Sequence, residues 1–105
     1  MASLIIFSTP SVVVIGCAQF KISIPGANSL KDKRMVIRSL KDRMLNKMNI
    51  SIAEVDYQDT WKSCALAVVT VAAEKHIVET RLSEVSEFIR SNPAIVVLDM
   101  MVEMI

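Results

Sequence analysis

Hydrophobic and polar residues alternate with a period of two along residues 12–24. One set of alternate positions is apolar or small, and the other is mostly polar. This alternation predicts a β-strand with one buried face. The strand is expected to end at Pro25-Gly26, because proline lacks a backbone N–H and glycine permits a turn. The residues predicted to form the buried face are Val14, Gly16, Ala18, Phe20, Ile22 and Ile24.

An amphipathic helix is predicted next, from a cap at Asn28 or Ser29 to about Met48. Lys33 falls inside its apolar stripe. We expect the stem of this side chain to pack while its ammonium reaches outward to water. The alternative is a buried lysine paired with a carboxylate. The stripe itself consists of Leu30, Val36, Ile37, Leu40, Met44 and Met48.

The rest of the chain predicts a strand, a tight turn, a second strand, a helix and a last strand. Asn92-Pro93 ends this helix, because the residue before a proline is pushed out of the helical region. In the last strand, apolar residues alternate with Asp99 and Glu103, and Val96, Leu98, Met100, Val102 and Met104 are expected to share one face. The five segments are residues 50–57, 58–60, 61–73, 74–91 and 94–105.

The predicted order is therefore β-α-β-β-α-β. Two right-handed βα units of this kind form a four-stranded antiparallel sheet with both helices on one face, the ferredoxin-like α+β arrangement. We assign residues 12–105 to a single domain of this fold. Residues 1–11 form an N-terminal extension, either a frayed arm or an added edge strand.

Composition limits the cellular setting. The chain has 105 residues, a net charge of +1 and 52% hydrophobic residues. Two cysteines fit a reducing cytoplasm better than a disulfide framework. Residues 14–17 resemble a lipoprotein cleavage box, but no basic residue precedes them and residues 8–11 interrupt the apolar run. No stretch reaches the roughly 20 apolar residues that a membrane helix needs, so we expect a cytoplasmic protein without a membrane partner.

Positive charge is concentrated in the first helix. Seven of the 12 basic residues lie between Lys31 and Lys47. Like charges at helical spacing repel one another, and an anionic partner such as an RNA phosphate backbone would relieve that cost. The alternatives are a solvated face neutralised by nearby carboxylates, or an acidic protein as partner. The nucleic-acid-binding residues predicted on one flank of the stripe are Lys31, Arg34, Arg38 and Lys41.

The chain offers little for catalysis. Its one histidine, His76, is predicted on the polar face of the second helix, and only two glycines are present, too few for a phosphate-cradling loop. Glu54, Asp56 and Asp59 could hold a divalent ion, but a solvated strand end and turn is the preferred interpretation. We therefore predict a non-enzymatic protein without catalytic residues, metal or cofactor.

The helix-free face of the sheet is the second candidate surface. It has few aromatic residues on which bases could stack. A face rich in alanine and valine favours a subunit interface instead, and a homodimer would also account for the high apolar content. The residues predicted for this interface are Trp61, Ala65, Ala67, Val69 and Met101.

Three ordered motifs carry a resemblance to a known family. They are I-P-G-A-N-S-L-K-D-K-R from Ile24, N-I-S-I-A-E-V from Asn49, and Q-D-T-W from Gln58. Together they resemble the small bacterial YlxP-like family, a domain-of-unknown-function group, over residues 12–105. The resemblance implies a ferredoxin-like fold. Members are often encoded beside translation and ribosome-maturation factors, which implies a partner such as RNA or a ribosomal particle. The chain departs from the family in residues 1–11 and in an almost uncharged third strand.

Overall fold

A computed structural model describes residues 9, 11–56 and 60–105. The order of elements is strand, helix, strand, strand, helix, strand, as predicted. Residues 58 and 59 of the predicted turn and almost all of the 1–11 extension lie outside the described residues. The elements are β1 (Val14–Ser23), α1 (Leu30–Lys47), β2 (Ser51–Asp56), β3 (Ser63–Ala72), α2 (Lys75–Arg90) and β4 (Val96–Met104).

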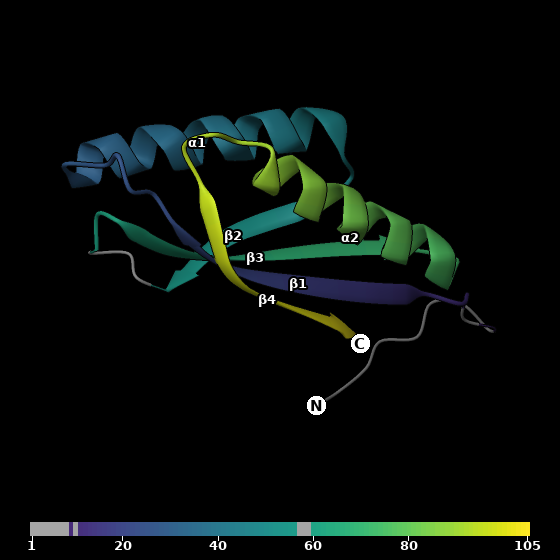
Figure 1. The fold of residues 1–105 in the computed structure, drawn as a ribbon. Coiled ribbons are helices and arrows are strands. Elements are labelled where there is room, and N and C mark those ends of the chain that lie inside the picture. The colour runs from purple at the N-terminus through teal and green to yellow at the C-terminus, as the bar shows by residue number, and fades with distance from the viewer. Residues whose placement is uncertain (1–8, 10, 57–59) are drawn as a thin grey trace.

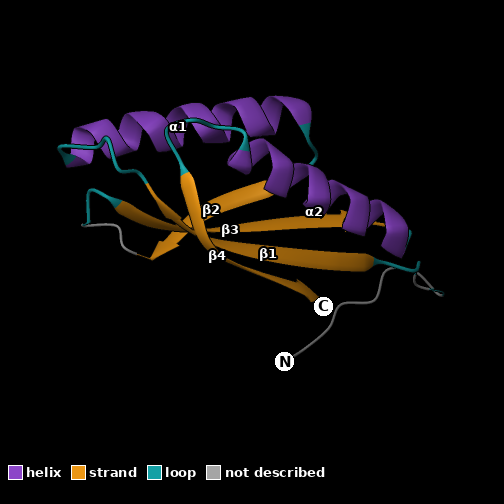
Figure 2. Cartoon of the chain, in the orientation of Figure 1, coloured by secondary structure: helices purple, strands orange, loops and turns teal. Residues whose placement is uncertain are grey.

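The four strands form one antiparallel sheet in the order β2-β3-β1-β4. Figure 1 shows both helices on the same side of this sheet, and Figure 2 shows the same two layers coloured by secondary structure. The other side of the sheet carries no helix. The ferredoxin-like α+β fold predicted from the pattern is confirmed.

β1 supplies the centre of the core. Its residues Ala18, Phe20 and Ile22 are at most 1% exposed, and all three point toward the helices. The alternation along this strand is what buries them, since successive side chains of a strand project to opposite faces. The helices contribute Leu40, Met44, Val78, Leu82, Val85 and Ile89 to the same cluster.

α1 begins at the cap that the sequence suggested. Ser29 is the N-cap, and its side-chain oxygen accepts a hydrogen bond from the Asp32 N–H at 3.1 Å. The Asp32 carboxylate in turn accepts the Asn28 N–H at 3.0 Å. Side-chain acceptors at a helix start satisfy N–H groups that have no partner within the helix. The helix start is therefore held at the turn that follows β1.

Two predicted placements are wrong. Trp61 was placed in the third strand, but β3 begins at Ser63 and Trp61 lies in the loop before it. In β4, a bulge shifts the register so that Val97, rather than Leu98, lies opposite Ile22. A bulge adds one residue to one strand of a pair, so the predicted shared face of even-numbered residues is interrupted at Leu98.

Gly16 permits the close approach of α2 to β1. A Cβ added at Gly16 would overlap the Val78 Cγ1 and lie 2.9 Å from the Leu82 Cδ1, and both of those side chains are buried. We expect Gly16→Ala to lower the free energy of unfolding by about 2 kcal/mol, as overpacking of a core typically does. Urea unfolding followed by circular dichroism measures this.

Gly26→Ala is the matched control, because a Cβ at Gly26 meets no atom within 4 Å. It should change stability by less than about 0.5 kcal/mol. Equal effects of the two substitutions would contradict the packing role of Gly16.

Candidate nucleic-acid interface

The outward face of α1 carries three exposed cations. Lys31, Arg34 and Arg38 project from the side of the helix opposite the buried Ile37 and Leu40. Within the described part of the chain, none of the three forms an ion pair. Asp42 is the carboxylate that lines the same stretch of surface. The predicted flank therefore exists as a solvent-facing row of positive charge.

Lys41 differs from the other three predicted residues. It is half-buried, and its charge is close enough to the buried Cys64 thiol to lower the pKa of that thiol. Its side chain therefore lies on the part of the flank that turns toward the sheet. Lys41 is less accessible to a large anionic partner than Lys31, Arg34 or Arg38.

Exposed apolar side chains accompany the row of cations. Met35 is 63% exposed and Leu45 is 48% exposed. The cations and Met35 surround a shallow depression of about 580 Å³ on the helix surface. The outward face of α1 thus combines positive charge with apolar contact area. The charge pattern of the sequence predicts the first of these but not the second.

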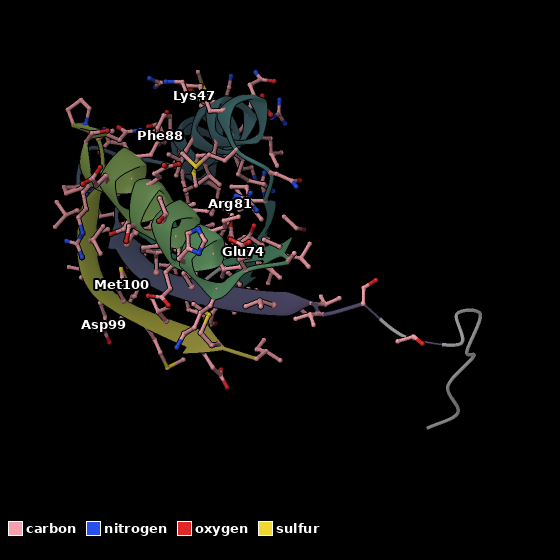
Figure 3. All side chains as sticks on the ribbon, turned by 90° about the vertical axis from the view of Figure 1, so that its right-hand side faces the viewer. Lys47, Glu74, Arg81, Phe88, Asp99 and Met100 are labelled. Carbon is pink, nitrogen blue, oxygen red and sulfur yellow. The ribbon has the colours of Figure 1, made fainter. Side chains whose placement is uncertain are left out.

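The opposite flank of α1 carries two further cations, which contact α2. The Arg43 guanidinium lies 5.6 Å from the centre of the Phe88 ring, and the Lys47 ammonium lies 5.1 Å from it. Figure 3 shows Lys47 on α1 next to Phe88 on α2. Cations over an aromatic face are attracted by its quadrupole. This contact depends on how the two helices pack, so the sequence pattern did not reveal it.

Lys33 is buried, and the expectation that its ammonium reaches water is wrong. The residue is 1% exposed. Its Nζ lies 3.3 Å from the Glu54 Oε1 of β2 and donates a hydrogen bond to the Thr60 carbonyl at 2.7 Å. A buried charge needs a partner and hydrogen bonds. Glu54 of β2 supplies the first, and the Thr60 carbonyl, in the loop before β3, supplies the second. The alternative of a buried lysine paired with a carboxylate is the correct one.

Cys64 lies beside this pair on β3. The pKa of its thiol is raised from 9.0 to about 12, mainly by burial and then by the negative charge of Glu54 and a hydrogen bond with Glu54, while the positive charges of Lys33 and Lys41 oppose the shift. A reactive cysteine needs a lowered pKa and access to solvent. Cys64 is fully buried, so it has the properties of a structural residue and not those of a nucleophile.

The carboxylates considered for a metal do not converge. Glu54 lies opposite Leu66 on the helix side of the sheet, whereas Asp56 lies opposite Ala65 on the other side. The bulge between Glu54 and Asp56 puts their side chains on opposite faces of the sheet. Asp59 lies outside the described residues. The described residues contain no cluster of three side chains suited to a metal ion. His76 is exposed and lies 3.3 Å from the Glu74 carboxylate.

The helix-free face of the sheet brings most of the predicted interface residues together. Ala67 and Met101 flank Gln19 on either side, and Val69 lies opposite Cys17. Val69 and Met101 are 38% and 55% exposed, while Ala65 and Ala67 are partly covered. Trp61 is 49% exposed but stands outside the strand. A role of this face in dimerisation stays a prediction.

Comparison with known proteins places the chain in a family. Residues 15–102 match the family described as "Protein of unknown function (DUF503)". The chain belongs to this family. The uncharacterized protein YlxP of Bacillus subtilis strain 168 is 39% identical over 82 residues, which cover 78% of this chain and 89% of YlxP. The resemblance to YlxP-like proteins is therefore confirmed.

A solved structure has a similar fold. The C-terminal segment of the alpha subunit of aIF2 from Pyrococcus abyssi superimposes with a TM-score of 0.50 and 14% identity. The match covers 93% of this chain and 52% of that one, so this DUF503 protein spans about half the length of that structure. At this identity the likeness shows the fold alone. No helix in the described part of this DUF503 chain is long and apolar enough to cross a membrane.

The Lys33–Glu54 pair is expected to stabilise the fold. We expect Lys33→Met to lower the free energy of unfolding by about 2–3 kcal/mol, because it leaves the Glu54 carboxylate without its close cation. Lys33→Met combined with Glu54→Met should recover at least half of that loss. Lys31→Met makes the same chemical change at an exposed position and should be nearly neutral. A loss in the double variant as large as in Lys33→Met would contradict the pairing.

The raised pKa of Cys64 predicts a loss of stability at high pH. Above pH 9 the unfolded thiol ionises while the folded one keeps its proton, so this contribution is complete below pH 9 and is lost as the pH rises toward 12. Between pH 8 and pH 10, wild type should lose about 1.4 kcal/mol more than Cys64→Ala. Urea unfolding at both pH values measures this. Ile22→Val, a truncation opposite Cys64 in the sheet, should keep the wild-type pH dependence.

Proposed function

We propose that this protein is a non-enzymatic RNA-binding protein, associated with ribosomal particles, that docks through the outward face of α1. The observation that carries the proposal is the row of Lys31, Arg34 and Arg38, three exposed cations without an ion pair among the described residues. The net charge of the whole chain is only +1. Attraction to RNA therefore has to come from this local concentration of charge.

The geometry favours contact with the phosphate backbone. A helix rises about 1.5 Å per residue, so Lys31, Arg34 and Arg38 span about 10 Å along the axis. Such a row can contact more than one phosphate of a strand. Arginine and lysine contacts to phosphate position a protein on nucleic acid without reading its sequence. The binding we propose is accordingly electrostatic and tolerant of sequence.

The helix-free sheet face is a poorer candidate for RNA. Recognition of bases on such a sheet relies on aromatic side chains within the strands. The described strand positions of this face are aliphatic, small, polar or charged, and none of them is aromatic. Trp61 is exposed nearby but is not part of β3. We therefore assign the RNA contact to α1.

A salt titration of RNA binding tests the proposal. The variant Arg34→Ala/Arg38→Ala should weaken binding to a mixed-sequence single-stranded RNA. It should also reduce the slope of log affinity against log salt by about 1.4, since each lost phosphate contact removes about 0.7. The helix should remain folded, because both side chains are exposed and alanine favours helices. Fluorescence anisotropy measures both quantities.

Lys75→Ala/Arg90→Ala is the matched control. It also removes two exposed cations, but from α2. Its salt slope should stay close to that of wild type. Equal effects of the two double variants would show that only total charge matters, and binding unchanged by Arg34→Ala/Arg38→Ala would remove the proposal. Ribosomal subunits of Bacillus subtilis, in place of the free RNA, test the association with particles.

A further inference from the structure

The outer side of β4 is an unusually open sheet edge. The strand order β2-β3-β1-β4 places β2 and β4 at the edges, and among the described residues nothing pairs with the outer side of β4. Edge strands are commonly protected by short length, lysine, proline or a covering element. Both edge strands contain a bulge and neither contains Lys, Arg or Pro, but β2 has only six residues whereas β4 has nine, and residues 99–104 of β4 follow its bulge in regular pairing with β1. β4 therefore lacks protection by short length, lysine or proline.

The ladder with β1 shows which backbone groups of β4 are free to pair. The Ile105 N–H donates to the Ile15 carbonyl at 2.9 Å. Hydrogen-bonded and non-hydrogen-bonded pairs alternate along an antiparallel ladder. In the observed register, Glu103 and Met101 therefore direct their N–H and C=O groups toward β1. The groups of Met100, Val102 and Met104 point to the open edge.

Apolar side chains accompany this edge. Val102 is 45% exposed and Met100 is 38% exposed, although both lie on the helix side of the sheet. α2 packs mainly on β1 and β3, so a groove of about 520 Å³ remains between α2 and β4, with Met100, Val102 and Met104 on its floor. Figure 3 shows Met100 and Asp99 on β4, at the left edge of the view.

We propose that β4 pairs antiparallel with β4 of a second copy of this chain, so that the two sheets join into one. Antiparallel pairing of two identical strands places a two-fold axis at the centre of the pair. With the axis perpendicular to the sheet, the helices of both copies lie on the same side of the joined sheet. The axis then passes midway between one residue and the same residue of the second copy. The charges of β4 then restrict which residue this is.

Of the five registers with the axis at a residue from Asp99 to Glu103, three oppose carboxylates. An axis at Asp99 or Glu103 places that residue opposite its own copy, and an axis at Met101 places Asp99 opposite Glu103 twice. Like charges directly opposite each other destabilise a strand pair. Neither strand carries a basic residue that would compensate. These three registers are therefore unfavourable.

The other two of these five registers avoid opposed carboxylates, with the axis at Met100 or at Val102. An axis at Met100 extends the pairing through the bulge at Leu98. Its central bonds need the Met100 N–H, which already donates to the Asp99 carboxylate at 2.9 Å, whereas with the axis at Val102 only the outer pair of Met100 and Met104 uses that N–H. An axis at Val102 uses the outward groups of Val102 at its centre and lies entirely beyond the bulge. It places Met100 opposite Met104 of the second copy and buries Val102 against Val102 of the second copy.

The self-complementary register is the reason to choose a second copy as the occupant. A strand of the same length, with the same apolar positions on the groove side, is available in every copy of the chain. Such pairing satisfies edge N–H and C=O groups and covers Met100 and Val102 together. The proposal is independent of RNA binding, and it differs from an interface on the helix-free sheet face.

Sedimentation equilibrium with one pair of variants tests this interface. Wild type should form a dimer between about 1 and about 200 µM. Val102→Lys should raise the dimer dissociation constant at least tenfold, because it places two ammonium groups opposite each other at the axis. Lysine is well tolerated on a solvent-facing edge strand, so the monomer should stay folded by circular dichroism.

Val71→Lys is the matched control. Val71 is 50% exposed and lies opposite Ile15 on the helix-free face. It should leave the dimer intact. A wild-type monomer throughout the concentration range overturns the proposal, and so does dissociation by Val71→Lys but not by Val102→Lys. If both variants dissociate, oxidation of Val102→Cys in a Cys17→Ser background decides. A disulfide-linked dimer supports the β4 interface, and its absence overturns it.

Discussion

The packing of both helices onto one face of the sheet is the constraint on which the rest of the structure depends. Ala18, Phe20 and Ile22 are almost completely removed from water on that face, and Gly16 lets α2 approach closely. Burial of apolar surface is the main favourable term in folding. Once two helices share one face, the other face and the outer part of β4 remain uncovered. The candidate surfaces of the molecule are consequences of this one-sided cover.

α1 carries buried and exposed cations, and the direction of each side chain relative to the sheet decides which kind it is. Lys33 points at the sheet and is held by Glu54 and the Thr60 carbonyl, whereas Arg34, the next residue, points to solvent. Successive residues of a helix differ by about 100° in direction. The buried cation contributes to the anchoring of α1 on β2, and this anchoring keeps the exposed cations on the side of the helix away from the sheet.

The surfaces left open differ in chemistry, so they suit different partners. The outward face of α1 is basic with exposed Met35 and Leu45, which suits a polyanion. The outer edge of β4 is apolar and acidic with free backbone groups, which suits another strand and would repel RNA. A dimer through β4 would therefore leave both α1 helices accessible. The helix-free sheet face is a third surface, which borders the edge at Met101 of β4, and its role stays a prediction.

The sequence by itself determined the elements, their order and the fold, because the periods of two and 3.6 residues are strong local signals. It also located the exposed cations Lys31, Arg34 and Arg38, since a helix and its buried stripe fix which side faces water. Only the tertiary structure decided the fate of Lys33, the half-burial of Lys41 and the bulge at Leu98. Each of these depends on a neighbouring strand. Glu54 and Cys64 lie far from α1 in the sequence but next to it in the fold, and pairing with β1 sets the register of β4. Local periodicity carries no information about such contacts, so they had to be seen in the folded molecule.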